Sequence, residues 1–78
     1  MTAKSKAREL LAGVLRIPVD KLPENPTPDS VEDWDSLAHG EILMALEDLV
    51  GRELDAAEIA AISGLGDIEA ILEKAGVV

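Results

Sequence analysis

Apolar residues recur every three or four positions in several stretches of the chain, which is the spacing of amphipathic α-helices. The first stretch covers residues 3–15 and is preceded by Thr2, a candidate N-cap. Pro18 follows it and ends the helix, because proline cannot continue the backbone hydrogen bonding. The longest stretch covers residues 36–50 and is followed by Gly51, a residue typical of helix C-termini. The pattern therefore predicts two helices in the first two thirds of the chain.

Two further helices are predicted near the end of the chain. The run Asp55-Ala56-Ala57-Glu58 has the capping-box pattern, which indicates the start of a short third helix. Residues 67–75 form a fourth apolar-periodic stretch that stops at Gly76. Residues 18–35 contain four prolines, so no helix is expected there. Four apolar residues are expected to anchor this long loop: Ile17, Val19, Leu22 and Val31.

These elements predict an all-α fold, a small four-helix bundle with a long first loop and a short third helix. At 78 residues the chain has the size of one domain, expected to span residues 1–78. The apolar stripes of the four helices are expected to meet in one core. Its predicted members are Leu10, Leu11, Val14, Ile42, Leu46, Val50, Ile59, Ile62, Ile68 and Leu72.

Composition narrows the range of functions. The chain has no cysteine, so disulfides and zinc–thiolate sites are excluded. Its net charge of −9 argues against nucleic-acid binding and is compatible either with basic protein partners or simply with solubility. We see no signal peptide and no apolar run of membrane-spanning length. The sequence therefore predicts a soluble, cytoplasmic, monomeric protein that binds neither nucleic acid nor membrane.

Ser36 is the leading candidate for a functional residue. It follows the acidic loop, in the run Trp34-Asp35-Ser36-Leu37, and stands at the start of the second helix. A small hydroxyl side chain at a helix start commonly serves as the N-cap. A helix N-terminus also favours a phosphate group, because its N–H groups and the positive end of the dipole point outward. The sequence leaves open whether Ser36 is a cap, a site of modification, or both.

The second helix carries more apolar surface than its core contacts require. At 100° per residue, Leu37 and Met44 lie opposite the core residue Leu46. The side opposite the core, which we call the outer face, comprises Leu37, Gly40, Glu41, Met44, Glu47 and Asp48. Single exposed apolar residues are common, and Leu37 has the alternative of folding back against the loop. The other interpretation is a docking surface, with apolar contacts for affinity and carboxylates that pair with Arg or Lys of a partner.

Taken together, these features of the chain resemble those of an acyl carrier protein. The resemblance rests on Asp35-Ser36-Leu37 at the head of an acidic second helix, and on Leu46-Glu47-Asp48, which is similar to the family's usual Leu-Glu-Glu. The order and lengths of the predicted helices match as well, so the resemblance covers nearly the whole chain. In that family the serine of the Asp-Ser-Leu motif carries a 4′-phosphopantetheine arm.

The resemblance implies a function and a set of partners. Ser36 would be the attachment site of the arm, which a phosphopantetheinyl transferase moves from coenzyme A, and Asp35 would contact that transferase. The thiol of the arm would hold an acyl or aminoacyl group as a thioester. The outer face would bind the transferase, a loading ligase or acyltransferase, and downstream biosynthetic enzymes. The chemistry would belong to the cofactor and the partners, so we expect no enzyme activity in this chain.

Three departures from the family pattern indicate a specialised carrier rather than one of housekeeping fatty-acid synthesis. Asp33 stands where the family commonly has glycine, and Trp34 follows it. Gly40 stands where valine or a similar residue is frequent. The Gly-Gly that usually precedes the aspartate in peptidyl carrier proteins is absent. Neither the pathway nor the cargo, whether acyl, aminoacyl, hydroxyacyl or polyketide, follows from the sequence.

Other chemistry is less well supported. His39 lies one turn from Ser36, but the chain offers no oxyanion donors, so a half-buried structural histidine is the preferred interpretation. Trp34 is interpreted as a buried anchor of the loop rather than a contact for cargo. The acidic loop lacks the spacing of a calcium site, so no metal and no catalytic residue is predicted. The alternative function is an unmodified acidic helical adaptor that binds basic protein partners through its second helix.

Overall fold

The structure is a computed structural model and describes residues 2–77. Within this range the chain is all-helical, without a strand, in the order α1 (Ala3–Leu15), η1 (Val19–Lys21), α2 (Ser36–Val50), α3 (Ala56–Ala61) and α4 (Leu65–Ala75). The predicted fold class is confirmed. Residues 1 and 78 of the expected domain lie outside the described part. None of the described helices is both long and apolar enough to span a membrane.

Local signals set most of the helix ends. The Thr2 side chain accepts a hydrogen bond from the backbone N–H of Ser5, so it caps α1 as predicted. Gly51 and Gly76 end α2 and α4 with φ values of 76° and 70°, in the left-handed region that glycine adopts without steric cost. The long loop is less irregular than expected, because Val19–Lys21 forms one 3₁₀ turn directly after Pro18.

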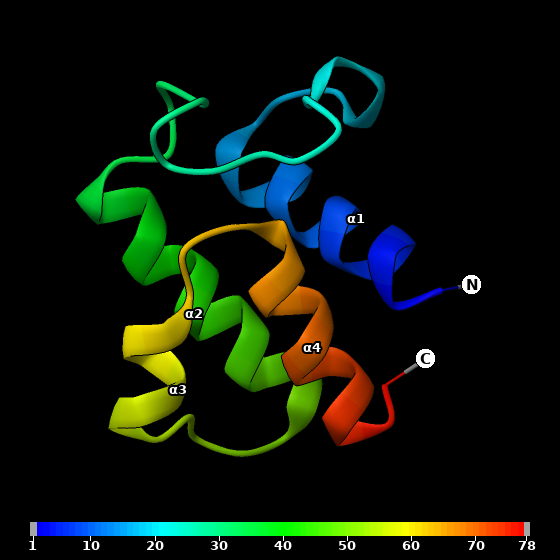
Figure 1. Cartoon of the computed structure of the whole chain (residues 1–78), viewed down its shortest axis with the longest axis vertical. Helices are drawn as coiled ribbons and strands as arrows, with labels where there is room; N and C mark the ends of the chain where they lie inside the picture. The colour runs from blue at the N-terminus through cyan, green and yellow to red at the C-terminus, as the bar shows by residue number, and fades with distance from the viewer. Residues whose placement is uncertain (1, 78) are drawn as a thin grey trace.

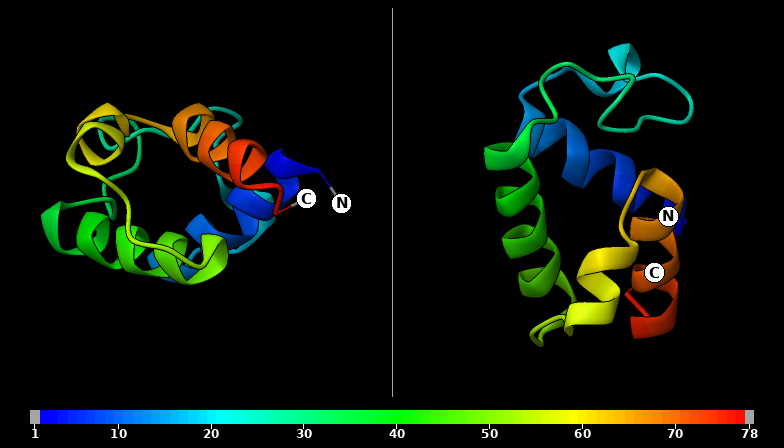
Figure 2. Two further views of the ribbon diagram at one scale, coloured as in Figure 1. Left: turned by 90° about the horizontal axis from the view of Figure 1, so that it is seen from below. Right: turned by 60° about the vertical axis from the view of Figure 1, so that its left-hand side comes forward.

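The four α-helices surround one core, and the proline-rich loop lies across the end of the bundle where α2 and α4 begin (Figure 1). Helix α1 packs mainly against α4 and then against α2, and the start of α1 and the end of α4 lie on the same side of the molecule (Figures 1 and 2). The molecule measures 28 × 27 × 17 Å.

The predicted core is confirmed in its centre and corrected at its edges. Six of its members are buried: Leu11, Ile42, Leu46, Ile62, Ile68 and Leu72. The other four are only partly buried against them: Leu10, Val14, Val50 and Ile59. Small residues of α1 take up central positions instead, with Ala7 fully buried, because α1 and α4 approach closely there.

Buried side chains and a backbone hydrogen bond hold the loop against the helices. Leu22, Val31 and Trp34 are buried, whereas Val19 is 43% exposed and does not anchor the loop as predicted. Pro26 is also fully buried, and its carbonyl accepts a hydrogen bond from the backbone N–H of Leu65. This bond lets α4 begin at Leu65, two residues before the predicted start.

A side chain at position 64 would crowd this contact between the loop and α4, because its neighbours would have to shift by a few tenths of an ångström. A Cβ at Gly64 would lie 3.3 Å from Cγ2 of Thr27 and 3.4 Å from the carbonyl oxygen of Pro26. The proline loop is thus packed directly on the first turn of α4, and this contact forms one side of the region around Ser36.

Candidate functional site

Ser36 is the first residue of α2, and its side chain is exposed to solvent. The N-cap is not Ser36 but Asp35, whose Oδ1 accepts a hydrogen bond of 2.9 Å from the backbone N–H of Ala38. A carboxylate one residue before the helix can accept this bond and also complements the helix dipole. Of the two interpretations left open for Ser36, that of the N-cap is therefore wrong, and its hydroxyl is not needed for that purpose.

The first turn of α2 retains hydrogen-bonding capacity next to the Ser36 hydroxyl. The backbone N–H groups of Ser36 and Leu37 belong to the turn in which an α-helix offers no acceptor of its own. Together with the dipole, they make this position favourable for a phosphate group carried by the Ser36 oxygen. The neighbouring Asp35 carboxylate opposes an added negative charge, but it is exposed to solvent, which weakens the repulsion.

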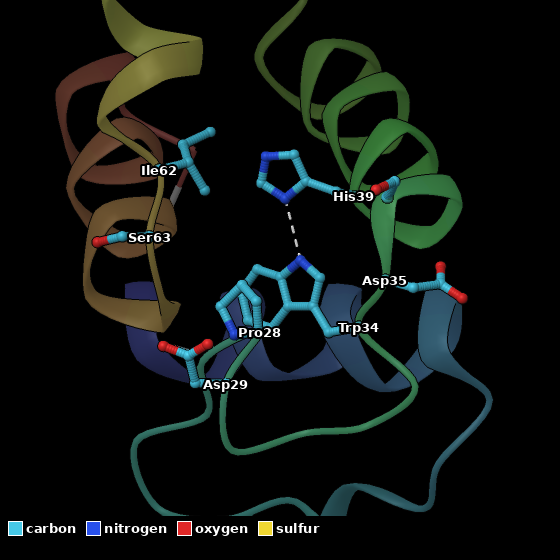
Figure 3. Close-up of a pocket in the computed structure, with 8 residues that line it drawn as sticks. Pro28, Asp29, Trp34, Asp35, His39, Ile62 and Ser63 are labelled. Atoms are coloured by element: carbon cyan, nitrogen blue, oxygen red, sulfur yellow. Dashed lines mark hydrogen bonds between the residues drawn. The ribbon is translucent and has the colours of Figure 1, made fainter.

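A hollow of about 660 Å³ lies beside Ser36, open to solvent, between the start of α2, the proline loop and the α3–α4 segment (Figure 3). We call it the Ser36 hollow, and its lining consists of Pro28, Asp29, Trp34, Asp35, Ser36, His39, Ile62 and Ser63. Figure 3 shows His39 of α2 and Ile62 facing each other across it. The hollow is large enough for a small organic group next to the serine hydroxyl.

Trp34 and His39 form the polar centre of this lining. The indole Nε1–H of Trp34 donates a hydrogen bond of 3.0 Å to Nδ1 of His39 (Figure 3). The centroids of the two rings are 6.1 Å apart, and the ring planes are inclined to each other by 24°. Trp34 is 3% exposed and His39 is half-buried, so the predicted burial of both side chains is confirmed.

The outer face of α2 is exposed as predicted. Leu37 and Met44 are 76% and 69% exposed, and neither folds back onto the loop. Glu41 and Asp48 are exposed beside them. Gly40 is exposed as well, and a Cβ there would meet no atom within 4 Å, so packing does not require a glycine at this position. These five residues form a continuous surface that is apolar in its middle and acidic on one border.

Glu47 does not belong to this free surface. It is half-buried, and its Oε2 accepts a hydrogen bond of 2.9 Å from the backbone N–H of Leu54. Its carboxylate thus ties the end of α2 to the segment before α3. The sequence could not show this contact, because it depends on how the chain turns after Gly51.

Next to Glu47, an ion pair and a capping box fix the start of α3. Both terminal nitrogens of Arg52 donate hydrogen bonds of 2.8 Å to the Glu58 carboxylate. The predicted capping box is confirmed, since Asp55 Oδ1 accepts from the Glu58 N–H and the Glu58 carboxylate accepts from the Asp55 N–H. The hydrogen bonds from Arg52 and then from Asp55 lower the pKa of Glu58 from 4.5 to about 2. These bonds lie at the turn from α2 to α3, which we call the α2–α3 corner, and they fix the start of the short helix α3. After α3 the chain continues into Ile62 and Ser63, which line the Ser36 hollow.

Sequence reasoning missed half of the lining of the Ser36 hollow. Pro28 and Asp29 come from the loop, and Ile62 and Ser63 come from the α3–α4 segment, so no local pattern marks them as neighbours of Ser36. Among residues 2–77, no group of three or more His, Asp or Glu side chains is arranged to hold a metal ion.

Comparison of the chain with models of known protein families, with curated proteins and with solved structures found no match.

Proposed function

We propose that this protein is a carrier that holds an acyl or aminoacyl group as a thioester on a 4′-phosphopantetheine arm attached to Ser36. The observation that carries the proposal is the position of Ser36, exposed at the first residue of α2 and directly beside the Ser36 hollow. Its hydroxyl is accessible, and Asp35 supplies the cap in its place. Modification of Ser36 would therefore cost the fold little.

The chain's own residues would hold and present the arm. Attachment would replace the hydroxyl proton of Ser36 with the phosphopantetheinyl group of coenzyme A, and adenosine 3′,5′-bisphosphate would be the leaving group. The first-turn N–H groups of Ser36 and Leu37 would donate hydrogen bonds to the phosphodiester oxygens. The bound arm would supply the thiol that this cysteine-free chain lacks.

The outer face of α2 is the proposed docking surface for a phosphopantetheinyl transferase, a loading ligase or acyltransferase, and downstream enzymes. Leu37 and Met44 would provide the desolvated contacts, and Met44 can adapt its shape to several partners. Glu41 and Asp48 would pair with basic residues of those partners. Glu47 is better assigned to the structure of the α2–α3 corner than to partner binding, because its carboxylate is already bonded.

The proposal is tested by the intact mass of the protein after incubation with coenzyme A and a phosphopantetheinyl transferase of broad specificity. We expect the mass to rise by one phosphopantetheinyl group per chain. An unchanged mass, with a known carrier modified in a parallel reaction, would contradict the proposal.

The second candidate is an unmodified helical adaptor, which the exposure of Leu37 and Met44 also favours. An adaptor would use the same face of α2 but would need no accessible Ser36. The same mass measurement separates the two, because only the carrier gains the arm.

A further inference from the structure

One hydrogen bond in the lining of the Ser36 hollow forms only when the acceptor nitrogen of His39 is unprotonated. A tryptophan indole N–H is a donor only, so the His39 nitrogen that faces it must be unprotonated to accept. Protonation of Nδ1 would place two donors against each other and abolish the bond. Histidine is the side chain that ordinarily changes its charge between about pH 5 and 8.

The bond joins the last part of the proline loop to α2. Trp34 belongs to the proline loop, and its buried ring is part of the core. His39 belongs to the second turn of α2, one turn past Ser36. Because Trp34 is 3% exposed, its N–H would have little access to water once His39 stopped accepting. Loss of the bond therefore favours movement of the loop, of the imidazole, or of both.

The charged groups around His39 favour such a movement. The proline loop contributes the Asp29 carboxylate to the hollow, and the start of α2 contributes the Asp35 carboxylate. The α3–α4 segment contributes Ile62, which is uncharged, and Ser63, whose hydroxyl donates to Asp67. No Lys or Arg is part of the lining. A protonated imidazole would thus lose its indole partner in a hollow whose other charges are negative, and attraction would draw it toward them.

We infer that the Trp34–His39 hydrogen bond is a proton-sensitive latch that holds the loop against α2 and sets the shape of the Ser36 hollow. With His39 neutral, the latch is closed and the hollow has the form described above. With His39 protonated, the latch opens and the wall formed by Trp34 moves relative to Ser36. Resting on the proposed function, this latch makes access of partner enzymes to Ser36 depend on pH, and Trp34 and His39 act as positioning residues.

The latch can be followed directly, because the chain has one tryptophan and one histidine. The experiment records the NMR resonance of the Trp34 indole N–H, and its exchange with water, between about pH 8 and pH 5. His39→Gln supplies an amide oxygen that accepts from the indole at every pH, and His39→Leu supplies no acceptor. We expect the wild-type signal to match that of His39→Gln at the high end of the range and to shift away from it, toward that of His39→Leu, at the low end.

A wild-type signal that follows His39→Gln over the whole range would overturn the latch. That comparison remains decisive even if His39→Leu does not fold, because it needs only the wild type and the Gln variant. Identical pH profiles of the indole signal in all three proteins would also overturn the latch, because the signal would then not depend on residue 39.

The link to Ser36 is tested separately by the kcat/KM of arm transfer for the wild type and His39→Gln at each pH. Their ratio cancels the pH dependence of the transferase itself. We expect the ratio to change by at least about 5-fold across the range, the lower end of typical coupling between two sites. A constant ratio would refute regulation of Ser36 by the latch. No arm transfer to either protein would refute the proposed function, while the indole signal would still decide whether the latch exists.

Discussion

At the scale of single residues, the four serines of the chain differ in what their hydroxyl groups do. The Ser5 hydroxyl accepts a hydrogen bond from Thr2, the Ser30 hydroxyl bonds with Thr27, and the Ser63 hydroxyl donates to Asp67. The Ser36 hydroxyl has no hydrogen-bond partner among residues 2–77 and lines the hollow. The structure thus gives a reason, beyond motif position, for expecting modification at Ser36 alone.

We predict that Ser36→Ala abolishes the coenzyme A-dependent mass gain and changes the free energy of unfolding by less than about 0.5 kcal/mol, as for most exposed positions. Asp35→Ala should be less stable than the wild type by about 1 kcal/mol, because it removes the cap of α2. Mass spectrometry measures the mass gain, and urea unfolding measures the stability of the two variants. Ser30→Ala and Ser63→Ala serve as controls that keep the mass gain, and a mass gain that persists in Ser36→Ala would refute the assignment.

At the scale of elements, α2 presents two apolar sides with different environments. Ile42 and Leu46 are fully buried, whereas Leu37 and Met44 face solvent beside two carboxylates. If the exposed side binds partners, its charged and apolar residues should act on different steps of binding. Charges at the edge of an interface speed association, and apolar residues that are desolvated in the interface slow dissociation.

We predict that Asp48→Lys mainly lowers the association rate with the transferase and reduces its dependence on salt. Met44→Ala should mainly raise the dissociation rate and cost at least about 1 kcal/mol of binding free energy. Surface plasmon resonance at two ionic strengths measures both rates. Glu9→Lys, on exposed surface of α1, is the matched control for Asp48→Lys. Equal losses from these two variants would show that diffuse negative charge, rather than α2, explains binding.

Glu47→Lys is a poor test of docking, even though the charge pattern of α2 suggests it. Its carboxylate accepts from Leu54, so the substitution would disturb the α2–α3 corner as well as any partner contact. Glu41→Lys is the cleaner second variant, because Glu41 is exposed on the same side of α2 as Asp48.

A pH-dependent contribution to stability is expected from the Glu58 carboxylate at the start of α3. Its pKa is lowered to about 2 by the hydrogen bonds from Arg52 and Asp55, so the folded state favours the ionised form. This contribution is therefore complete above the unfolded-state pKa of 4.5 and is lost as the pH falls through about 2.

We predict that Glu58→Gln is less stable than the wild type at neutral pH, and that the difference shrinks as the pH falls from 4.5 to about 2. Glutamine can still reach back to the N-cap N–H, so the variant removes mainly the ionic bond with Arg52. Thermal unfolding followed by circular dichroism over this range measures the difference. A difference that does not vary with pH would contradict the pairing.

At the scale of the whole molecule, Arg8 connects α1 to the loop that crosses the end of the bundle. Its two terminal nitrogens donate to four backbone carbonyl groups, with distances from 2.8 to 3.3 Å. The acceptors are Val19, Leu22, Pro23 and Glu24. The two terminal nitrogens of the guanidinium carry four N–H donors in a rigid planar fork, whereas a lysine ammonium has only three donors on a flexible stem.

We predict that Arg8→Lys lowers the free energy of unfolding by about 1–3 kcal/mol and speeds hydrogen exchange in the loop. The reason is that some of the four carbonyls would lose their donor while the charge is kept. Urea unfolding and amide exchange of residues 17–31 provide the measurements. Arg16→Lys makes the same chemical change at an exposed position and is the control. Similar effects from the two variants would rule out a special role of Arg8.

The sequence by itself determined the four α-helices and most of the exposed side of α2. Thr2, Gly51 and the capping box of α3 mark helix ends through short-range chemistry, and the prolines exclude an α-helix from the loop. The exposure of Leu37 and Met44 follows from the 100° step of the α-helix alone. Contacts of this kind join residues a few positions apart, so the sequence contains the information needed to predict them.

Only the tertiary structure decided what surrounds Ser36. The bond between Pro26 and Leu65, which starts α4 early, joins residues far apart in the chain. The hollow itself needs the loop, α2 and the α3–α4 segment to converge, and the Arg8 contacts span 11 to 16 positions. Such contacts depend on how whole helices pack around the shared core, and no local pattern of polar and apolar residues specifies that packing.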